Sequence, residues 1–264
     1  MKHLNQFILV LITKVYNYQT MFPTEINLNN LEYKEPQNNR NGGKVVHIST
    51  KPGSNDWKDR IRFQMSEDNK TNLQTAVWGL STPLSGDTSR RTLELTIESD
   101  TLLKFLEELD NKNIQTSQER SKLWFKKDFD YATVESMYVR LVKEPSKPDA
   151  KPTIRVKVKC GEYPTNIYVV DDDTNGKLIY HRGTPEDLTR NVKCMVMCDT
   201  VGLWFMSKQF GMSLTAAEIM VWPNRRATGI DAFTLSNDTT LLKNTDVIMQ
   251  QHSNNLDEGE VMVD

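Results

Sequence analysis

The sequence predicts a mainly β fold with a helical insert, an α+β arrangement that follows an extended N-terminal arm and precedes a disordered acidic C-terminal tail. Apolar and polar residues alternate with period two in several short segments, which is typical of half-buried strands. Leucines recur at helical spacing within residues 99–145. Of the 264 residues, 38% are hydrophobic, which is enough for one core with much of the chain left in solvent.

These patterns divide the chain into four parts. Residues 1–20 hold an apolar run of six, at 7–12, that is too short to span a membrane. We expect an upstream extension from a misassigned start there, with a signal peptide as the alternative. Residues 21–43 are polar and predict an extended arm. Residues 44–226 carry the strand and helix signals, and 227–264 are polar and acidic, which predicts a flexible tail.

The strand signals follow one another along the chain. The stretch 44–49 suits a first strand, and 57–65 alternates apolar residues with a polar face that carries Arg60 and Arg62. The stretch 92–97 predicts another strand. The clearest alternation is at 153–160, where Arg155, Lys157 and Lys159 point away from the apolar face. Further strands are expected at 166–170, 178–180, 192–198, 202–205 and 214–222.

The helical insert lies at about 99–145. Ser99 or Asp100 can cap the first helix, in which leucines recur at helical spacing. Further helices are expected at about 117–127 and 131–142. Pro145 and Pro148 then close the insert.

The three cysteines argue against a disulfide framework and for a reducing compartment, because their number is odd and small. On the expected strand at 192–198, Cys194 and Cys198 share one face. Buried apolar thiols are therefore favoured over a zinc site. We expect no metal and no cofactor.

Sequence signals for catalysis are weak, and we expect a protein that is not an enzyme. Phosphate-loop, zinc-protease and nucleophile-elbow motifs are absent. Asp171, Asp173 and Asn175-Gly176 match the start of a calcium loop, but the twelfth position holds Arg182 in place of a glutamate. A hairpin turn at Asn175-Gly176 is favoured instead. A cryptic catalytic site around 171–173 is kept as an alternative.

Cations and aromatic rings together predict a surface for single-stranded nucleic acid. Such proteins need a cationic groove for phosphates and exposed rings on which bases stack. Rings in turns beside basic strands are better stacking candidates than Trp204 or Phe205, which are expected in the core. A solvated charged face is the ordinary alternative for each strand. The candidate residues are Trp57, Arg60, Arg62, Arg140, Lys143, Lys147, Lys151, Arg155, Lys157, Lys159 and Tyr163.

Charge is distributed unevenly between the body and the tail. Residues 227–264 hold seven acids and one base, a charge of −6, so the rest carries +4 of the net −2. The last acids are Asp257, Glu258, Glu260 and Asp264. A tethered polyanion competes for a cationic groove at high effective concentration, and once displaced it can recruit partners.

Several segments in a fixed order carry a family resemblance. They are LEYKEP followed by NGGK, SKLWFKKDF followed by a Tyr-x-x-Leu-Val helix, PTIRVKVKC, IYVVDDDTNGK, and GLWFMSKQFGMSLTAAEIMVWP. This order, over about residues 21–222, resembles the single-stranded-DNA-binding proteins of nucleocytoplasmic large DNA viruses, especially those that infect algae. That family is similar to the replication single-strand-binding protein of T-odd bacteriophages.

The resemblance implies an OB-fold barrel that binds single-stranded DNA in viral replication, recombination or repair. It also implies that the acidic tail recruits replication proteins such as DNA polymerase, and an intracellular location in the host nucleus or a cytoplasmic virus factory. The phage relatives end in an aromatic residue, whereas this chain ends Val263-Asp264. A homodimer is left open, and no membrane association is expected. The alternative is a virion structural or assembly protein with a β-sandwich core.

Overall fold

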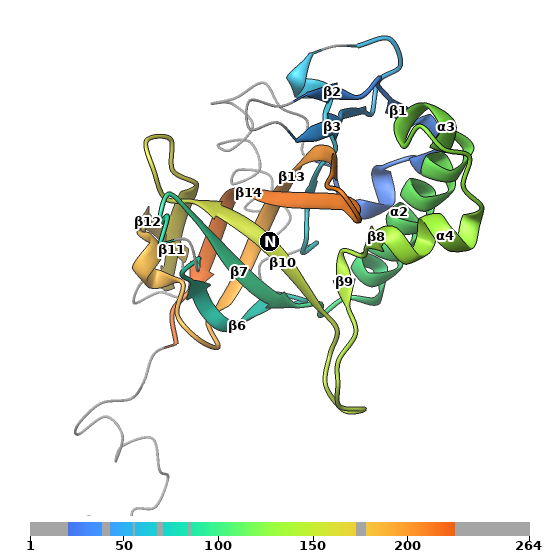
Figure 1. Ribbon diagram of the computed structural model, residues 1–264. Coiled ribbons are helices and arrows are strands. Elements are labelled where there is room, and N and C mark those ends of the chain that lie inside the picture. Colours follow the sequence, from blue (N-terminus) through green and yellow to red (C-terminus); the bar gives the residue numbers. More distant parts are fainter. Residues whose placement is uncertain are drawn as a thin grey trace, which may run out of the picture. The chain divides into compact units, whose positions relative to one another are not determined.

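The computed structural model describes residues 21–38, 43–54, 56–67, 71–83, 86–172 and 178–224 (Figure 1). The chain divides into two units, Met1–Asn224 and Arg225–Asp264, and every described residue belongs to the first. The expected extension at 1–20 and the acidic tail at 227–264 lie outside the described residues, as does the expected turn at 173–177.

The described part of the chain is mostly strand, with an insert of helices between β7 and β10. The strands are β1 (Glu32–Tyr33), β2 (Gln37–Asn38), β3 (Lys44–Val46), β4 (Ile48–Ser49), β5 (Arg62–Gln64), β6 (Gln74–Ser81), β7 (Arg90–Thr96), β8 (Tyr138–Val139), β9 (Val142–Lys143), β10 (Thr153–Lys159), β11 (Asn166–Asp172), β12 (Leu178–Arg182), β13 (Lys193–Phe205) and β14 (Phe210–Trp222). The helices are α2 (Asp100–Glu119), α3 (Ser121–Trp124) and α4 (Tyr131–Met137), with 3-10 turns η1 (Pro23–Glu25), η2 (Leu28–Asn30), η3 (Trp57–Asp59) and η4 (Pro185–Asp187). The predicted mainly β fold with a helical insert is confirmed.

Five of these strands form a closed circuit of ladders. β6 pairs antiparallel with β7, and β7 pairs antiparallel with β10. β10 pairs parallel with β14, β14 pairs antiparallel with β13, and β13 returns antiparallel to β6. β11 and β12 extend the sheet beyond β14, while β3 and β2 extend it beyond β13. The circuit differs from the two stacked sheets expected of a sandwich.

β10 shows why the strand faces separate as they do. Its apolar side chains at 154, 156 and 158 are fully buried, whereas Arg155, Lys157 and Lys159 are exposed. Successive side chains of a strand point to opposite faces, so the period-two pattern places three cations on the outside of the circuit. Each buried aliphatic side chain contributes about 1.5–3 kcal/mol to folding.

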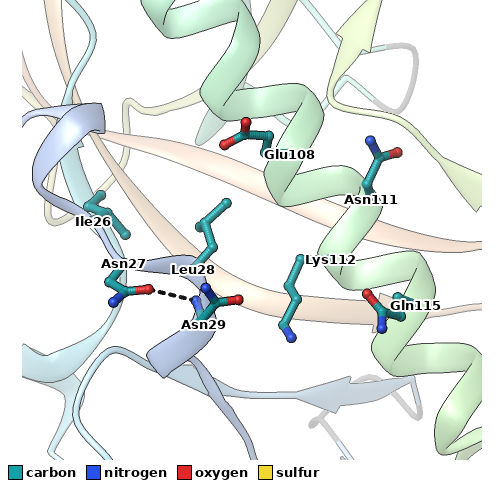
Figure 2. Close-up of a pocket in the computed structure, with 8 residues that line it drawn as sticks. All are labelled: Ile26, Asn27, Leu28, Asn29, Glu108, Asn111, Lys112 and Gln115. Carbon is teal, nitrogen blue, oxygen red and sulfur yellow. Dashed lines mark hydrogen bonds between the residues drawn. The ribbon is translucent and has the colours of Figure 1, made fainter.

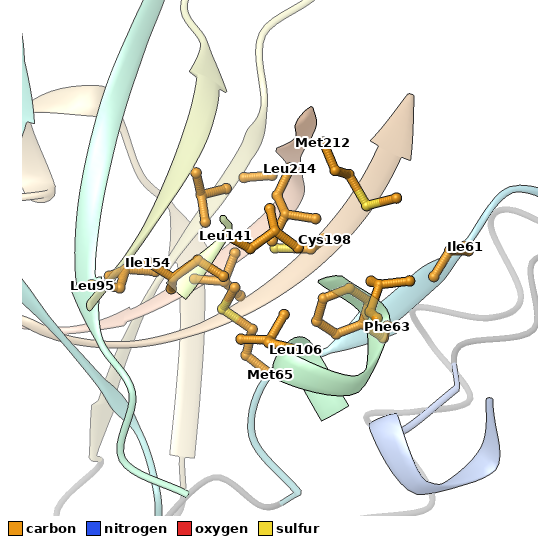
Figure 3. Packing of buried hydrophobic residues seen from close by; sticks show 14 of the residues in the cluster. Ile61, Phe63, Met65, Leu95, Leu106, Leu141, Ile154, Cys198, Met212 and Leu214 are labelled. Atoms are coloured by element: carbon orange, nitrogen blue, oxygen red, sulfur yellow. The ribbon is translucent and has the colours of Figure 1, made fainter. Parts of the chain in front are cut away.

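α2 closes over the same core. Its first turn is capped by Ser99, whose hydroxyl accepts the N–H of Leu102 at 3.4 Å, as predicted. Leu106 on the buried face of α2 belongs to one cluster with Phe63 and Met65 (Figure 3). The helix therefore packs on the face that the apolar half of β5 supplies.

The N-terminal arm packs against the folded domain. Met21 forms an isolated bridge with Phe63, and η1 and η2 contact α2. The hydroxyl of buried Tyr33 donates to Asn113 Oδ1 on α2 at 2.8 Å. The arm thus contributes residues to the main core.

Several predicted elements are corrected. The helix expected at 131–142 ends at Met137, and residues 138–143 form β8 and β9. The backbone there turns away because Asp110 accepts the N–H of Leu141 at 2.8 Å. α2 runs on to Glu119, into the helix expected at 117–127, of which α3 is a short remnant.

Other boundaries shift as well. β13 is one strand where two were expected, and its pairing with β14 shifts register between Met197 and Cys198 and again between Thr200 and Leu203. The strand expected at 57–65 begins as η3 and continues as the short strand β5, and the strand expected at 44–49 is split between β3 and β4.

Cys194 and Cys198 are fully buried free thiols, as the apolar interpretation predicted. Burial raises the pKa of the Cys194 thiol to about 12 and that of the Cys198 thiol well above its usual value. No helix in the described part of the chain combines the length and the apolar character needed to cross a membrane.

Candidate nucleic-acid interface

A groove of about 750 Å³ opens where β10 and β14 part from each other. The two strands pair only through Val156 with Leu214 and Lys157 with Thr215. Toward its N-terminal end β10 pairs with β9, whereas β14 pairs with β8. Residues 139–143, which we call the groove wall, line the resulting gap. The groove is therefore a product of strand divergence, and the helical insert supplies one of its sides.

The groove lining is cationic. It contains Lys44 from β3, Arg140 and Lys143 from the groove wall, and Arg155 and Lys157 from β10. No acidic residue is among the sixteen residues that the described structure places in the lining. Phosphate groups are attracted to such a surface.

Three of these cations share acidic partners just outside the lining. Lys143 Nζ and Arg155 Nε lie 3.4 and 3.2 Å from the carboxylate of Glu94. Arg140 Nη2 lies 2.6 Å from Glu135 Oε1. Partial burial acts to raise the pKa of Glu94, but the hydrogen bond from Thr153 and the two cations together hold it below its usual range. Glu94 and Glu135 orient the three cations, and their negative charges offset part of the positive charge of the groove.

Lys44 and Lys157 are held differently, by uncharged oxygens. Lys44 Nζ donates to the carbonyl of Trp124 at 3.4 Å, and Lys157 Nζ donates to Ser213 Oγ at 3.1 Å. Desolvation, and after it the charge of Arg90, lowers the pKa of Lys157. A bound phosphate would act in the opposite direction, because a nearby negative charge favours the charged form of a lysine.

Two aromatic rings and a methionine complete the lining at the C-terminal end of β13. Phe205 stacks on Phe210 with ring centroids 5.4 Å apart and an interplanar angle of 8°. Trp204 lies beside Gly211, at which a Cβ atom would stand 3.1 Å from the indole. Met206, at the β13–β14 turn, is 71% exposed. These groups offer flat and polarisable surfaces next to the cations.

A buried network anchors the groove wall to α2. Asp110, which is 1% exposed, accepts the hydroxyl of Tyr138 at 2.7 Å and the N–H of Leu141 at 2.8 Å. Asn113 Nδ2 donates to the Tyr138 hydroxyl at 3.0 Å. Burial raises the pKa of Asp110 to about 6, against the hydrogen bonds that lower it. One carboxylate thus holds both β8 and the residue that follows Arg140.

Four of the eleven residues predicted for DNA binding lie in the groove: Arg140, Lys143, Arg155 and Lys157. The structure adds Lys44, Trp204, Phe205 and Met206, none of which was among the predicted site residues. The sequence offered a signal for one ring only: adjacent residues of a strand face opposite sides, so Trp204 and Phe205 cannot both belong to the core, and it is Phe205 that packs against the main cluster.

Six of the others have described side chains and lie outside the groove lining. Arg62 forms a two-point ion pair with Asp199, in which Nη2 lies 2.6 Å from Oδ2, and Lys151 Nζ lies 2.5 Å from Glu98. Those two cations were expected on open faces and are committed to acids instead. Arg60 is half-buried, Lys147, Lys159 and Tyr163 are exposed, and Trp57 lies in η3 with a side chain outside the description.

A second pocket, of about 440 Å³, lies between η2 and α2 (Figure 2). Half of its lining residues carry amides, including Asn27, whose side chain accepts the N–H of Asn29 at 3.0 Å, and the lining also holds one acid, Glu108, and one base, Lys112. It lacks the excess of cations and the rings of the groove. Asp171, at the proposed alternative catalytic site, lines neither pocket and lies 3.6 Å from His181.

No protein-family model and no curated protein sequence matches the chain. Among solved structures, a C-terminally truncated single-stranded DNA-binding protein from bacteriophage Enc34 is similar with a TM-score of 0.37 and 11% identity, over 76% of this chain and 99% of that one. The Enc34 protein in complex with single-stranded DNA gives 0.37 and 11%, over 74% and 98%. A single-stranded DNA-binding protein encoded by bacteriophage T7 gives 0.38 and 15%, over 68% and 96%.

Proposed function

We propose that the chain binds single-stranded DNA with little sequence preference, and that the strand lies in the groove between β10 and β14. The observation that carries the proposal is the lining, in which the described residues supply five cations and two aromatic rings but no acidic side chain. Cations can bind the phosphates of the DNA backbone, and such contacts carry no sequence information. Stacking on Trp204 and Phe205 would tolerate any base, because every base has a π-face.

We further propose that the closed circuit is an OB-fold barrel. Its strand order β6-β7-β10-β14-β13, with one parallel pair between β10 and β14, supports this. OB-folds bind oligonucleotides on a strand face and its bordering loops. The groove has that position, with β10 as its floor and the β13–β14 turn at its rim.

The biological setting is a proposal of its own, supported by the family resemblance of the sequence. We place the protein in viral DNA replication, recombination or repair, inside the host cell and without catalytic activity. The acidic tail would compete with DNA for the groove and recruit replication proteins such as DNA polymerase once displaced. The supporting observation is the charge of −6 on 227–264 against +4 on the rest.

The test is binding of a fluorescent oligo-dT probe by the full chain, measured by anisotropy over a range of salt concentrations. We expect affinity that falls steeply with salt. The double variant Lys157→Glu, Trp204→Ala should lose most of it, whereas the control Lys104→Glu, on the exposed face of α2, should keep it.

Undetectable binding at low salt would refute the proposal. Large DNA-independent oligomers, measured by light scattering, would favour the structural-protein alternative. Deleting residues 255–264 should tighten binding if the tail competes for the groove, and an unchanged affinity would remove the tail from the mechanism.

A further inference from the structure

β6 carries a wide bulge opposite β7. Ala76 pairs with Leu95 and Leu80 pairs with Leu93, so three residues of β6, at 77–79, stand against the single residue Glu94. The bulge requires glycine at its last position. Gly79 has φ +79°, and a Cβ atom there would lie 2.7 Å from the carbonyl oxygen of Leu188. The backbone of β6 is therefore fixed in this shape.

The bulge turns a tryptophan into solvent. Trp78 is 65% exposed, while Ala76 and Leu80 on either side pack into the core. The guanidinium carbon of Arg190 lies 4.9 Å from the centroid of the Trp78 rings. Tryptophan is usually among the most buried residues, and its burial is strongly favourable. Because the glycine-dependent bulge holds the Trp78 ring in solvent, we expect this ring to contact a ligand.

The position of Trp78 follows from strand register. Glu94 is directly opposite Arg155 of the groove on one side and the 77–79 bulge on the other. Neighbouring strands lie ~4.8 Å apart, so the bulge stands about 10 Å across the sheet from Arg155. The carboxylate of Glu94 lies between them, but it is bonded to Thr153 and ion-paired with two groove cations. A DNA strand that leaves the groove across β7 therefore passes Glu94, whose negative charge is offset by its two cation partners, before it reaches Trp78.

We propose that Trp78 and Arg190 form a second stacking platform, which takes a nucleobase of a single strand that extends beyond the groove. One face of the indole carries the guanidinium, which also attracts the neighbouring phosphate. The inference rests on the proposed function, because it assigns a further contact to the same strand. It separates the groove, as the primary site, from Trp78, which only longer strands reach.

The experiment compares two oligo-dT probes, of about 4 and about 16 nucleotides, which span the site sizes of single OB-folds. The full chain is tested as wild type, Trp78→Ala, Trp78→Phe, Trp204→Ala and, as a matched exposed aromatic away from both sites, Tyr131→Ala. We expect Trp78→Ala to bind the short probe normally and the long probe about 5- to 150-fold more weakly, the range for losing one stacked base. Trp78→Phe should restore most of that loss.

Three outcomes would overturn the second platform. The first is a Trp78→Ala variant that binds the long probe like wild type while Trp204→Ala weakens both probes, a result that leaves the proposed function standing. The second is an equal loss on both probes, which would place Trp78 within the primary site. In the third, the wild type binds neither probe, and the proposed function fails with it.

Discussion

Replacing Lys157 by glutamine would isolate the contribution of one groove cation. The change removes the charge, keeps most of the stem and leaves an amide near Ser213 Oγ. Lys157 is on the exposed face of β10, so the free energy of unfolding should change by less than about 0.5 kcal/mol. An effect on DNA binding would then reflect the charge.

The expected loss of affinity follows from the number of phosphates that the groove cations neutralise. Each phosphate neutralised on a single strand contributes a slope of about −0.7 to a plot of log K against log salt. If all five lining cations contact phosphates, the wild-type slope is about −3.5; if only Lys44 and Lys157 do, it is about −1.4. Lys157→Gln should make either slope shallower by about 0.7, which is about fivefold in affinity at 0.1 M salt and close to nothing at 1 M.

Anisotropy titrations with oligo-dT at four or more salt concentrations measure both slopes. Lys104→Gln is the control, because Lys104 is an exposed lysine whose carboxylate neighbour is one helical turn away on α2. Equal slopes for wild type and Lys157→Gln would show that this lysine contacts no phosphate. A loss of affinity that persists unchanged in 1 M salt would show that the variant acts by distorting the groove.

Three further variants test the supports of the groove. Asp110→Asn should flatten the pH dependence of stability: with a folded-state pKa raised to about 6, Asp110 stabilises the fold below about pH 4, and about 3 kcal/mol of this is lost as pH rises through 6. Urea unfolding at both ends of that window measures it, and parallel pH profiles for variant and wild type would contradict it. Gly211→Ala should weaken oligo-dT binding, since the new Cβ would lie 2.8 Å from the Val139 carbonyl and 3.1 Å from Trp204; unchanged affinity and tryptophan fluorescence would show that the groove absorbs it. Leu106→Ala should lower the free energy of unfolding by about 2–5 kcal/mol, and a loss below 1 kcal/mol in urea would mean that α2 can collapse onto the cavity.

Local patterns predicted the elements in which buried and exposed residues follow the regular spacing of a strand or a helix. β10 was predicted with its three outer cations because it is regular along its whole length. The start of α2 was predicted because a capping serine precedes leucines at helical spacing. Both predictions depend only on residues that are close together in the sequence.

Long-range contacts decided what the sequence did not predict. β6 was missed because the 77–79 bulge breaks its alternation. The segment 138–142 was assigned to a helix from its spacing, but a carboxylate on α2, some 30 residues earlier, accepts the Leu141 N–H. Lys44 reaches the groove only through the pairing of β3 with β13. Contacts of this kind join residues that are far apart in the sequence, so local patterns do not reveal them.

The groove wall belongs to the insert between β7 and β10, so the width of the groove is set by helix packing as well as by the sheet. Residues 139–143 are held at one end by α4 and at their middle by Asp110 of α2. A change deep in the α2 interface would therefore act on the middle of the wall, where Asp110 holds Leu141, while the pairing of β8 with β14 and of β9 with β10 still fixes its two ends. The same scaffold could thus accept strands of different bulk through substitutions that never touch the ligand.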